Sequence, residues 1–87
     1  MASFEVRFKR SVAKDLRGIP NSDVKRILKR IRALAGDPRP SGSEKLSAQE
    51  RYRVRQGDYR IVYEIVDAEL VVVVVKVGHR REIYRGG

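Results

Sequence analysis

Arginines are concentrated in the segment RYRVRQGDYR, which places Arg51, Arg53, Arg55 and Arg60 within ten residues. A guanidinium group is permanently charged, and its forked N–H donors match two oxygens of a phosphate at once. It cannot release a proton near neutral pH, so it stabilises negative charge but does not serve as a general base. The segment therefore predicts a phosphate site.

The same segment has the pattern of a β-hairpin, which determines where these arginines lie. Gly57-Asp58 suits a two-residue type II′ turn, because glycine occupies the first central position. Arg55 then lies directly opposite Arg60, and opposed residues share one face of the sheet. Arg53 lies on that face too, so three guanidinium groups converge. The other face is apolar and suited to packing under helices, with Tyr52, Val54, Tyr59, Ile61, Tyr63 and Ile65.

Two interpretations of this arginine cluster are open. Like charges that face each other destabilise a strand pair, so folding alone does not favour the arrangement. In one interpretation the guanidinium groups pair with Asp58, Glu64 or Glu82 and make the open face of the sheet soluble. In the other, the open face binds a phosphate group, whose oxygens match the forked donors.

The C-terminal segment GHRREIY follows an apolar strand, so His79, Arg80 and Tyr84 should lie near one end of the sheet. Arg80 would add a further cation to the cluster. Tyr84 could stack on a base or donate a hydrogen bond to an oxygen. Taken alone, a tyrosine near the C-terminus or a single histidine more often has a structural role.

The composition also indicates a polyanionic partner. The 87 residues include 20 Lys and Arg against 11 Asp and Glu, a formal net charge of +9, which favours nucleic acid or an acidic protein. A membrane surface fits less well, because no segment combines a basic face with exposed large apolar residues. The chain has no cysteine and one histidine, which excludes disulfides and nearly excludes a metal site. We expect a single domain, residues 1–87, in the cytoplasm.

Apolar patterns predict four strands and two amphipathic helices. In chain order these are a strand in 3–9, helices in 10–18 and 21–35, and strands in 51–56, 59–66 and 70–77. Residues 37–44 are rich in turn formers and predict an irregular connection. The order β-α-α-β-β-β predicts an α+β fold, a small antiparallel sheet with the two N-terminal helices packed on one face. The edge at which the first strand joins is open.

The outward face of the second helix is basic and has no acidic residues one turn away. It carries Lys25, Arg26, Lys29, Arg30 and Arg32. Either this face is solvated, or it contacts the backbone of RNA.

The stretches KLSAQERYRVRQGDYRIVYEI and VVVVKVGHRREIY resemble RelE toxins of the RelE/ParE superfamily, from prokaryotic toxin–antitoxin modules. The resemblance extends from the opening strand to Tyr84. It implies a RelE-like fold and ribosome-dependent cleavage of mRNA in the A site, which leaves a 2′,3′-cyclic phosphate and a 5′-hydroxyl. It also implies that no metal or other cofactor takes part, and that the partners are the ribosome, mRNA and a cognate protein antitoxin.

The resemblance assigns roles to individual residues. Arg55, Arg60, Arg80 and Tyr84 fall on catalytic positions of the family, the three arginines to stabilise charge and Tyr84 to orient or stack the nucleotide. Arg53 is expected to hold the RNA backbone. Well-known RelE members have lysines where this chain has Arg53 and Arg55, and arginine is a poor general base.

The general base is therefore open. Lys45, His79 and Tyr84 are the titratable candidates, and His79 has the unperturbed pKa closest to neutrality. Lys45 and His79 are also predicted to contact the substrate. A further alternative is that ribosomal RNA groups and positioning suffice, with no side-chain base.

Two other functions are open as well. ParE-like members of the superfamily share the fold and inhibit DNA gyrase, although Arg60, Arg80 and Tyr84 together favour the nuclease branch. The chain could also be an RNA-binding module or an inactive toxin, whose binding would fall steeply with salt but lead to no cleavage.

Overall fold

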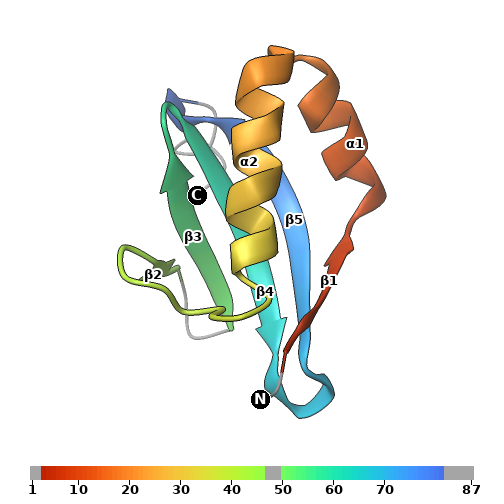
Figure 1. Cartoon of the computed structure of the whole chain (residues 1–87), viewed down its shortest axis with the longest axis vertical. Helices are drawn as coiled ribbons and strands as arrows, with labels where there is room; N and C mark the ends of the chain where they lie inside the picture. The colour runs from red at the N-terminus through yellow and green to blue at the C-terminus, as the bar shows by residue number, and fades with distance from the viewer. Residues whose placement is uncertain (1–2, 47–49, 82–87) are drawn as a thin grey trace.

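The computed structural model describes residues 3–46 and 50–81, which form two layers (Figure 1). One layer is a five-stranded sheet in the order β1-β5-β4-β3-β2, and the other consists of two helices. The strands are β1 Glu5–Phe8, β2 Glu44–Lys45, β3 Arg51–Gln56, β4 Tyr59–Val66 and β5 Val71–His79. The helices are α1 Arg10–Arg17 and α2 Asn21–Ala33, with a short 3-10 helix at Asp67–Glu69. Within these described ranges, no helix is both long and apolar enough to cross a membrane.

Both helices cover the same face of the sheet, and the core lies between the layers (Figure 1). Ile27 and Ile31 of α2 are fully buried, because positions that recur at three- and four-residue intervals share one side of a helix. The strands supply the other half of the core, with Tyr52, Val54, Ile61, Tyr63, Ile65, Val72, Val74 and Val77. The predicted α+β fold, with two N-terminal helices on one face, is confirmed.

The sheet differs from the prediction at its two edges. β1 pairs in parallel with β5, from Glu5 opposite Val71 to Phe8 opposite Val74, so the sheet is mixed rather than wholly antiparallel. Local pattern does not determine this pairing, because the two strands come from opposite ends of the chain. At the other edge, β2 lies where an irregular connection was predicted, and it pairs antiparallel with β3 over two residues.

The predicted hairpin of β3 and β4 is confirmed in its register. Gln56 lies opposite Tyr59 and Arg55 opposite Arg60. Gly57 has a φ of +60°, a left-handed value that glycine adopts without a Cβ penalty and that the first central position of a type II′ turn requires. The turn therefore determines which side chains share the face opposite the helices.

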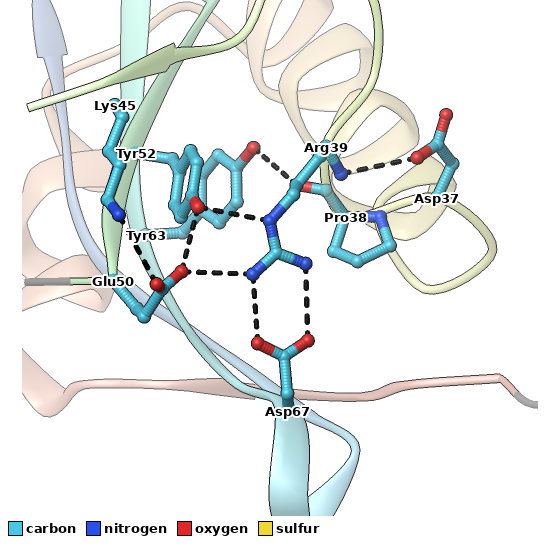
Figure 2. A network of polar contacts seen from close by, with 8 residues as sticks. All are labelled: Asp37, Pro38, Arg39, Lys45, Glu50, Tyr52, Tyr63 and Asp67. Atoms are coloured by element: carbon cyan, nitrogen blue, oxygen red, sulfur yellow. Dashed lines mark hydrogen bonds and ion pairs between the residues drawn. The ribbon is translucent and has the colours of Figure 1, made fainter.

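Arg39 connects the loop after α2 to the sheet (Figure 2). Its guanidinium donates to the two carboxylate oxygens of Asp67 at 3.1 and 2.8 Å, and to Glu50 at 2.9 Å. Its Nε donates to the Tyr52 hydroxyl at 3.0 Å, and the guanidinium carbon lies 5.2 Å from the centroid of that ring. We call these four residues the Arg39 network. It joins the loop to the start of β3 and to the end of β4.

The Arg39 network changes the acidity of its carboxyl groups. A hydrogen bond from Tyr52, together with those from Arg39 and Lys45, lowers the pKa of Glu50 to about 2. The hydrogen bond from Arg39 also lowers the pKa of Asp67. Both groups bind protons more weakly in the folded than in the unfolded chain. They therefore stabilise the fold above their usual pKa values, and this contribution is lost as the pH falls through the folded values.

The substitution Arg39→Met should lower the thermal midpoint at neutral pH and flatten its decline in acid. In the wild type, the midpoint should begin to fall below about pH 4.5 and continue to fall towards about pH 2, as Glu50 and Asp67 take up protons. Without the guanidinium, much of that difference between folded and unfolded pKa disappears. Thermal unfolding followed by circular dichroism over this range measures both effects. The exposed Arg17→Met is the matched control, and an identical acid profile for wild type and Arg39→Met would contradict the prediction.

Candidate functional site

A hollow of about 300 Å³ at the edge of the sheet brings together arginines from α2, β3 and β4. We call it the arginine pocket, and it is lined by Arg30, Gly42, Glu44, Arg53, Val54, Arg55 and Arg60. β2 pairs with β3 only at Tyr52 and Arg53. Beyond that point the edge of β3 has no neighbouring strand among the described residues, which leaves room for the pocket. The convergence of Arg53, Arg55 and Arg60 predicted from the hairpin is therefore present.

Arg60 is the one charged residue that is buried in the described part of the chain, with 6% of its surface exposed. Its guanidinium donates a long hydrogen bond of 3.4 Å to the Tyr59 carbonyl, and no carboxylate in the described ranges forms an ion pair with it. Burying a charge costs free energy unless a counter-charge or strong hydrogen bonds compensate. Arg60 therefore lies where an incoming anion would be favourable.

Carboxylates pair with the two remaining arginines of the hairpin, Arg51 and Arg53. Arg51 pairs with Glu64 across the two strands, and Arg53 donates to Glu44 at 2.9 Å. Of the three clustered arginines, Arg53 alone has an ion pair in the described ranges, and its partner Glu44 is not one of the carboxylates proposed from the sequence. Among the described residues, Arg55 has no such ion pair, and its side chain is exposed.

The other proposed carboxylate partners do not change this result. Asp58 contributes its backbone carbonyl, which accepts a hydrogen bond from the Arg80 N–H at 2.9 Å. Its carboxylate forms no ion pair within the described ranges. Glu82 lies outside the described residues.

Two predicted substrate contacts do not line the arginine pocket. His79 lies opposite Tyr59, with the two rings edge to face at 5.9 Å, in a separate hollow beside α1 that includes Asp15. Successive strand residues point to opposite faces, so Tyr59 and His79 share the helix-covered side while Arg60 does not. The Lys45 ammonium lies 3.3 Å from Glu50, beside the Arg39 network (Figure 2).

The tail begins close to the arginine pocket. Arg80 is exposed, and its backbone hydrogen bond to Asp58 places the start of the tail against the hairpin turn. The Arg80 side chain is not among those that line the pocket. Tyr84 lies outside the described residues, so its predicted role stays a prediction.

Arg30 and Glu44 also line the pocket. The sequence named Arg30 only as one of the basic residues of the second helix, with a solvated face and an RNA contact both open, and it did not single out Glu44. The Nε of Arg30 is buried and has no hydrogen-bond partner among the described residues. The sequence does contain a sign that Arg30 is partly buried, because Arg30 borders the apolar stripe of α2 between Ile27 and Ile31. Among the described residues that line the pocket, Glu44 has the one carboxylate, and a carboxylate can act as a proton acceptor. It lies in the segment predicted to be irregular, so no pattern pointed to it.

Comparison with known proteins connects this geometry to a family. The sequence profile of the family described as ParE toxin of type II toxin–antitoxin system, parDE, matches residues 6–84. RelE1, a candidate toxin of Methanocaldococcus jannaschii, is 28% identical over 86 residues, which cover 94% of this chain and 96% of RelE1.

Two solved structures have the same fold and cover nearly the whole chain. A chain of the toxin–antitoxin complex RelBE2 from Mycobacterium tuberculosis matches with a TM-score of 0.79 and 26% identity, over 90% of this chain and 99% of that chain. A mutant of the E. coli toxin RelE in the free state matches with a TM-score of 0.78 and 27% identity, over 98% and 93%. The chain therefore belongs to the ParE toxin family of type II toxin–antitoxin systems, and within the RelE/ParE superfamily it is a RelE-type toxin.

Proposed function

We propose that this toxin is an endoribonuclease that cuts mRNA in the ribosomal A site and needs no metal ion. The pair Arg55 and Arg60 is the observation that carries the proposal. The two residues are directly opposed, line one hollow and have no carboxylate partner among the described residues. Like charges in this position destabilise the hairpin by themselves, but they provide converging donors for a phosphate.

In the proposed reaction, the 2′-hydroxyl of a nucleotide attacks the adjacent phosphorus in line. The O2′–P bond forms while the P–O5′ bond breaks, which leaves a 2′,3′-cyclic phosphate and a 5′-hydroxyl. Negative charge develops on the non-bridging oxygens, where Arg55 and Arg60 bind them and Arg80 adds a third cation from the tail. Preorganised donors of this kind contribute roughly 3 to 4 kcal/mol each. Arg53 holds the RNA backbone, and Tyr84 orients or stacks the nucleotide.

The reaction also needs a group that accepts the proton of the 2′-hydroxyl. Arginine cannot accept it, and neither His79 nor Lys45 lines the arginine pocket. Tyr84, the third candidate from the sequence, lies outside the described residues. We assign this role to Glu44, whose carboxylate lines the pocket and is held at 2.9 Å by Arg53. The proton that completes the 5′-hydroxyl comes from solvent or from the ribosome.

Purified toxin added to translating ribosomes tests the proposal, with the 5′ ends of the mRNA mapped by primer extension. We expect cuts within A-site codons, no cuts when the same mRNA is free of ribosomes, and loss of cuts with Arg60→Ala. Absence of A-site cuts, combined with an Arg60→Ala variant that inhibits growth as strongly as the wild type, would overturn the proposal.

A second function, inhibition of DNA gyrase, is favoured by one observation. The profile that matches residues 6–84 is that of ParE toxins, and ParE-like members of the superfamily inhibit gyrase by protein contact. A supercoiling assay with purified gyrase distinguishes the two functions. Inhibition of supercoiling by a toxin that cuts no mRNA would replace the nuclease proposal with this one.

We also propose a cognate protein antitoxin that acts in the cytoplasm, where the ribosomes are. The Mycobacterium tuberculosis neighbour is a toxin–antitoxin complex, and the net charge of +9 favours a partner with an acidic segment. Charge attraction between the two should make the rate of association fall as ionic strength rises.

A further inference from the structure

A second hollow, of about 400 Å³, shares Arg30 with the arginine pocket. We call it the helix hollow, and it is lined by Arg26, Lys29, Arg30, Ala33 and Gln56. Gln56 and Arg55 are consecutive on β3 and point to opposite faces of the sheet, so Arg30, which lines both hollows, is the residue that connects them. None of the described residues that line the helix hollow is acidic.

Arg30 is held in an unusual state for a helix-surface residue. Its side chain is half-buried, and its Nε is fully buried without a hydrogen-bond partner among the described residues. A buried donor without an acceptor costs folding free energy. The part of the Arg30 side chain that stays exposed lines both hollows, so a ligand in either one can contact it, which marks Arg30 as a candidate binding residue.

The basic face of α2 therefore divides into two groups. Arg26, Lys29 and Arg30 line the helix hollow, whereas Lys25 and Arg32 line neither hollow. Composition alone does not separate the groups. The first group is continuous with the arginine pocket, and the second is simply solvated.

We propose that the RNA strand cut in the arginine pocket continues into the helix hollow, where Arg30 binds the backbone phosphate next to the scissile one. This inference rests on the proposed ribonuclease function. Single-stranded RNA carries a negative charge at every nucleotide, so two neighbouring cationic hollows suit its backbone. RNA is favoured over an acidic peptide because the arginine forks match phosphate oxygens, and because the Gln56 amide can both donate to and accept from a base edge.

Binding of a short RNA that cannot be cleaved tests the inference without any ribosome. A fluorescent 2′-O-methyl hexanucleotide is titrated with toxin at several salt concentrations, and the dissociation constant is measured by anisotropy. Arg30→Gln should weaken binding roughly tenfold, as expected for one lost charge-assisted hydrogen bond. It should also reduce the slope of log K against log salt by about 0.7, the value for one phosphate of a single strand.

Arg32→Gln is the matched control, because it removes the same charge from the same helix outside both hollows. We expect it to leave the affinity and the salt slope unchanged. Lys29→Gln tests whether the RNA extends into the helix hollow. It should weaken binding of the hexanucleotide but not of a dinucleotide, whose one phosphate occupies the arginine pocket alone. Equal effects of Arg30→Gln and Arg32→Gln on the hexanucleotide would overturn the inference.

A glutamate-rich peptide of equal charge distinguishes RNA from protein as the occupant. If Arg30→Gln weakens binding of the peptide as much as binding of the RNA, the helix hollow is a site for acidic protein and the inference is wrong.

Failure of the inference and failure of the proposed function can be distinguished. A toxin that cuts in the A site but binds RNA independently of Arg30 retains its function and loses this subsite. A toxin that never cuts, yet shows the Arg30 effect, loses the function and keeps the subsite.

Discussion

Replacing Arg60 by alanine is expected to reduce A-site cleavage by about 10²–10³-fold, the usual loss when one preorganised donor to a developing oxyanion is removed. Arg60 is the best-placed donor because it is buried beside Arg55 and has no carboxylate partner in the described ranges. The measurement is the single-turnover rate of mRNA cleavage on programmed ribosomes saturated with toxin. Saturation separates a loss of chemistry from a loss of binding.

Arg51→Ala is the control for this prediction, because it removes a guanidinium from the same hairpin without touching the arginine pocket. It should cleave at close to the wild-type rate. Arg60→Met, which keeps most of the side-chain volume, should unfold at or above the wild-type temperature, since a buried charge without a counter-charge is lost. If Arg60→Met is strongly destabilised and cleaves normally after correction for the unfolded fraction, Arg60 serves the fold and not the reaction.

Glu44→Gln should reduce the cleavage rate by about 10²–10⁴-fold, the range for loss of a general acid or base. The amide keeps the size of the side chain but cannot accept a proton. The variant should still bind the ribosome, so the loss should lie in the rate of the chemical step. Single-turnover rates of mRNA cleavage on ribosomes saturated with toxin measure it.

The pairing of Glu44 with Arg53 requires two further variants. Arg53→Met should weaken RNA binding but keep a saturating cleavage rate close to that of the wild type, which would show that the effect of Glu44→Gln does not act through Arg53. Glu69→Gln removes a carboxylate from the surface 3-10 helix and should behave as the wild type. If Glu44→Gln cleaves within twofold of the wild-type rate, a ribosomal group supplies the base and the assignment of Glu44 is wrong.

The sequence predicts the helices and the hairpin because each depends on local rules. The apolar stripe of α2 follows from its helical period, and the two-residue turn at Gly57 determines the register that puts Arg55 opposite Arg60. The parallel pairing of β1 with β5 depends on how the helices return the chain across the sheet. No local pattern encodes that path, and the two-residue strand β2 is too short to leave a pattern.

The sequence predicts the part of the arginine pocket that comes from a single hairpin. It does not predict the part that comes from separate elements packed together. Arg53, Arg55 and Arg60 share a face by register alone. Arg30 and Glu44 reach the pocket only because α2 and β2 pack near the same edge of β3, which depends on tertiary structure. His79 was placed near the cluster by its distance along the chain, but its pairing with Tyr59 puts its ring on the other side of the sheet.

The pairing of β1 with β5 also has a consequence for the synthesis of the toxin. Residues 5–8 leave the ribosome well before their partners at residues 71–74 are made. The β3–β4 hairpin leaves earlier, yet it lacks the strand β5 that covers its second edge until then. Contacts between distant parts of a chain form late and slowly. A nascent toxin therefore has no complete sheet until β5 has been made.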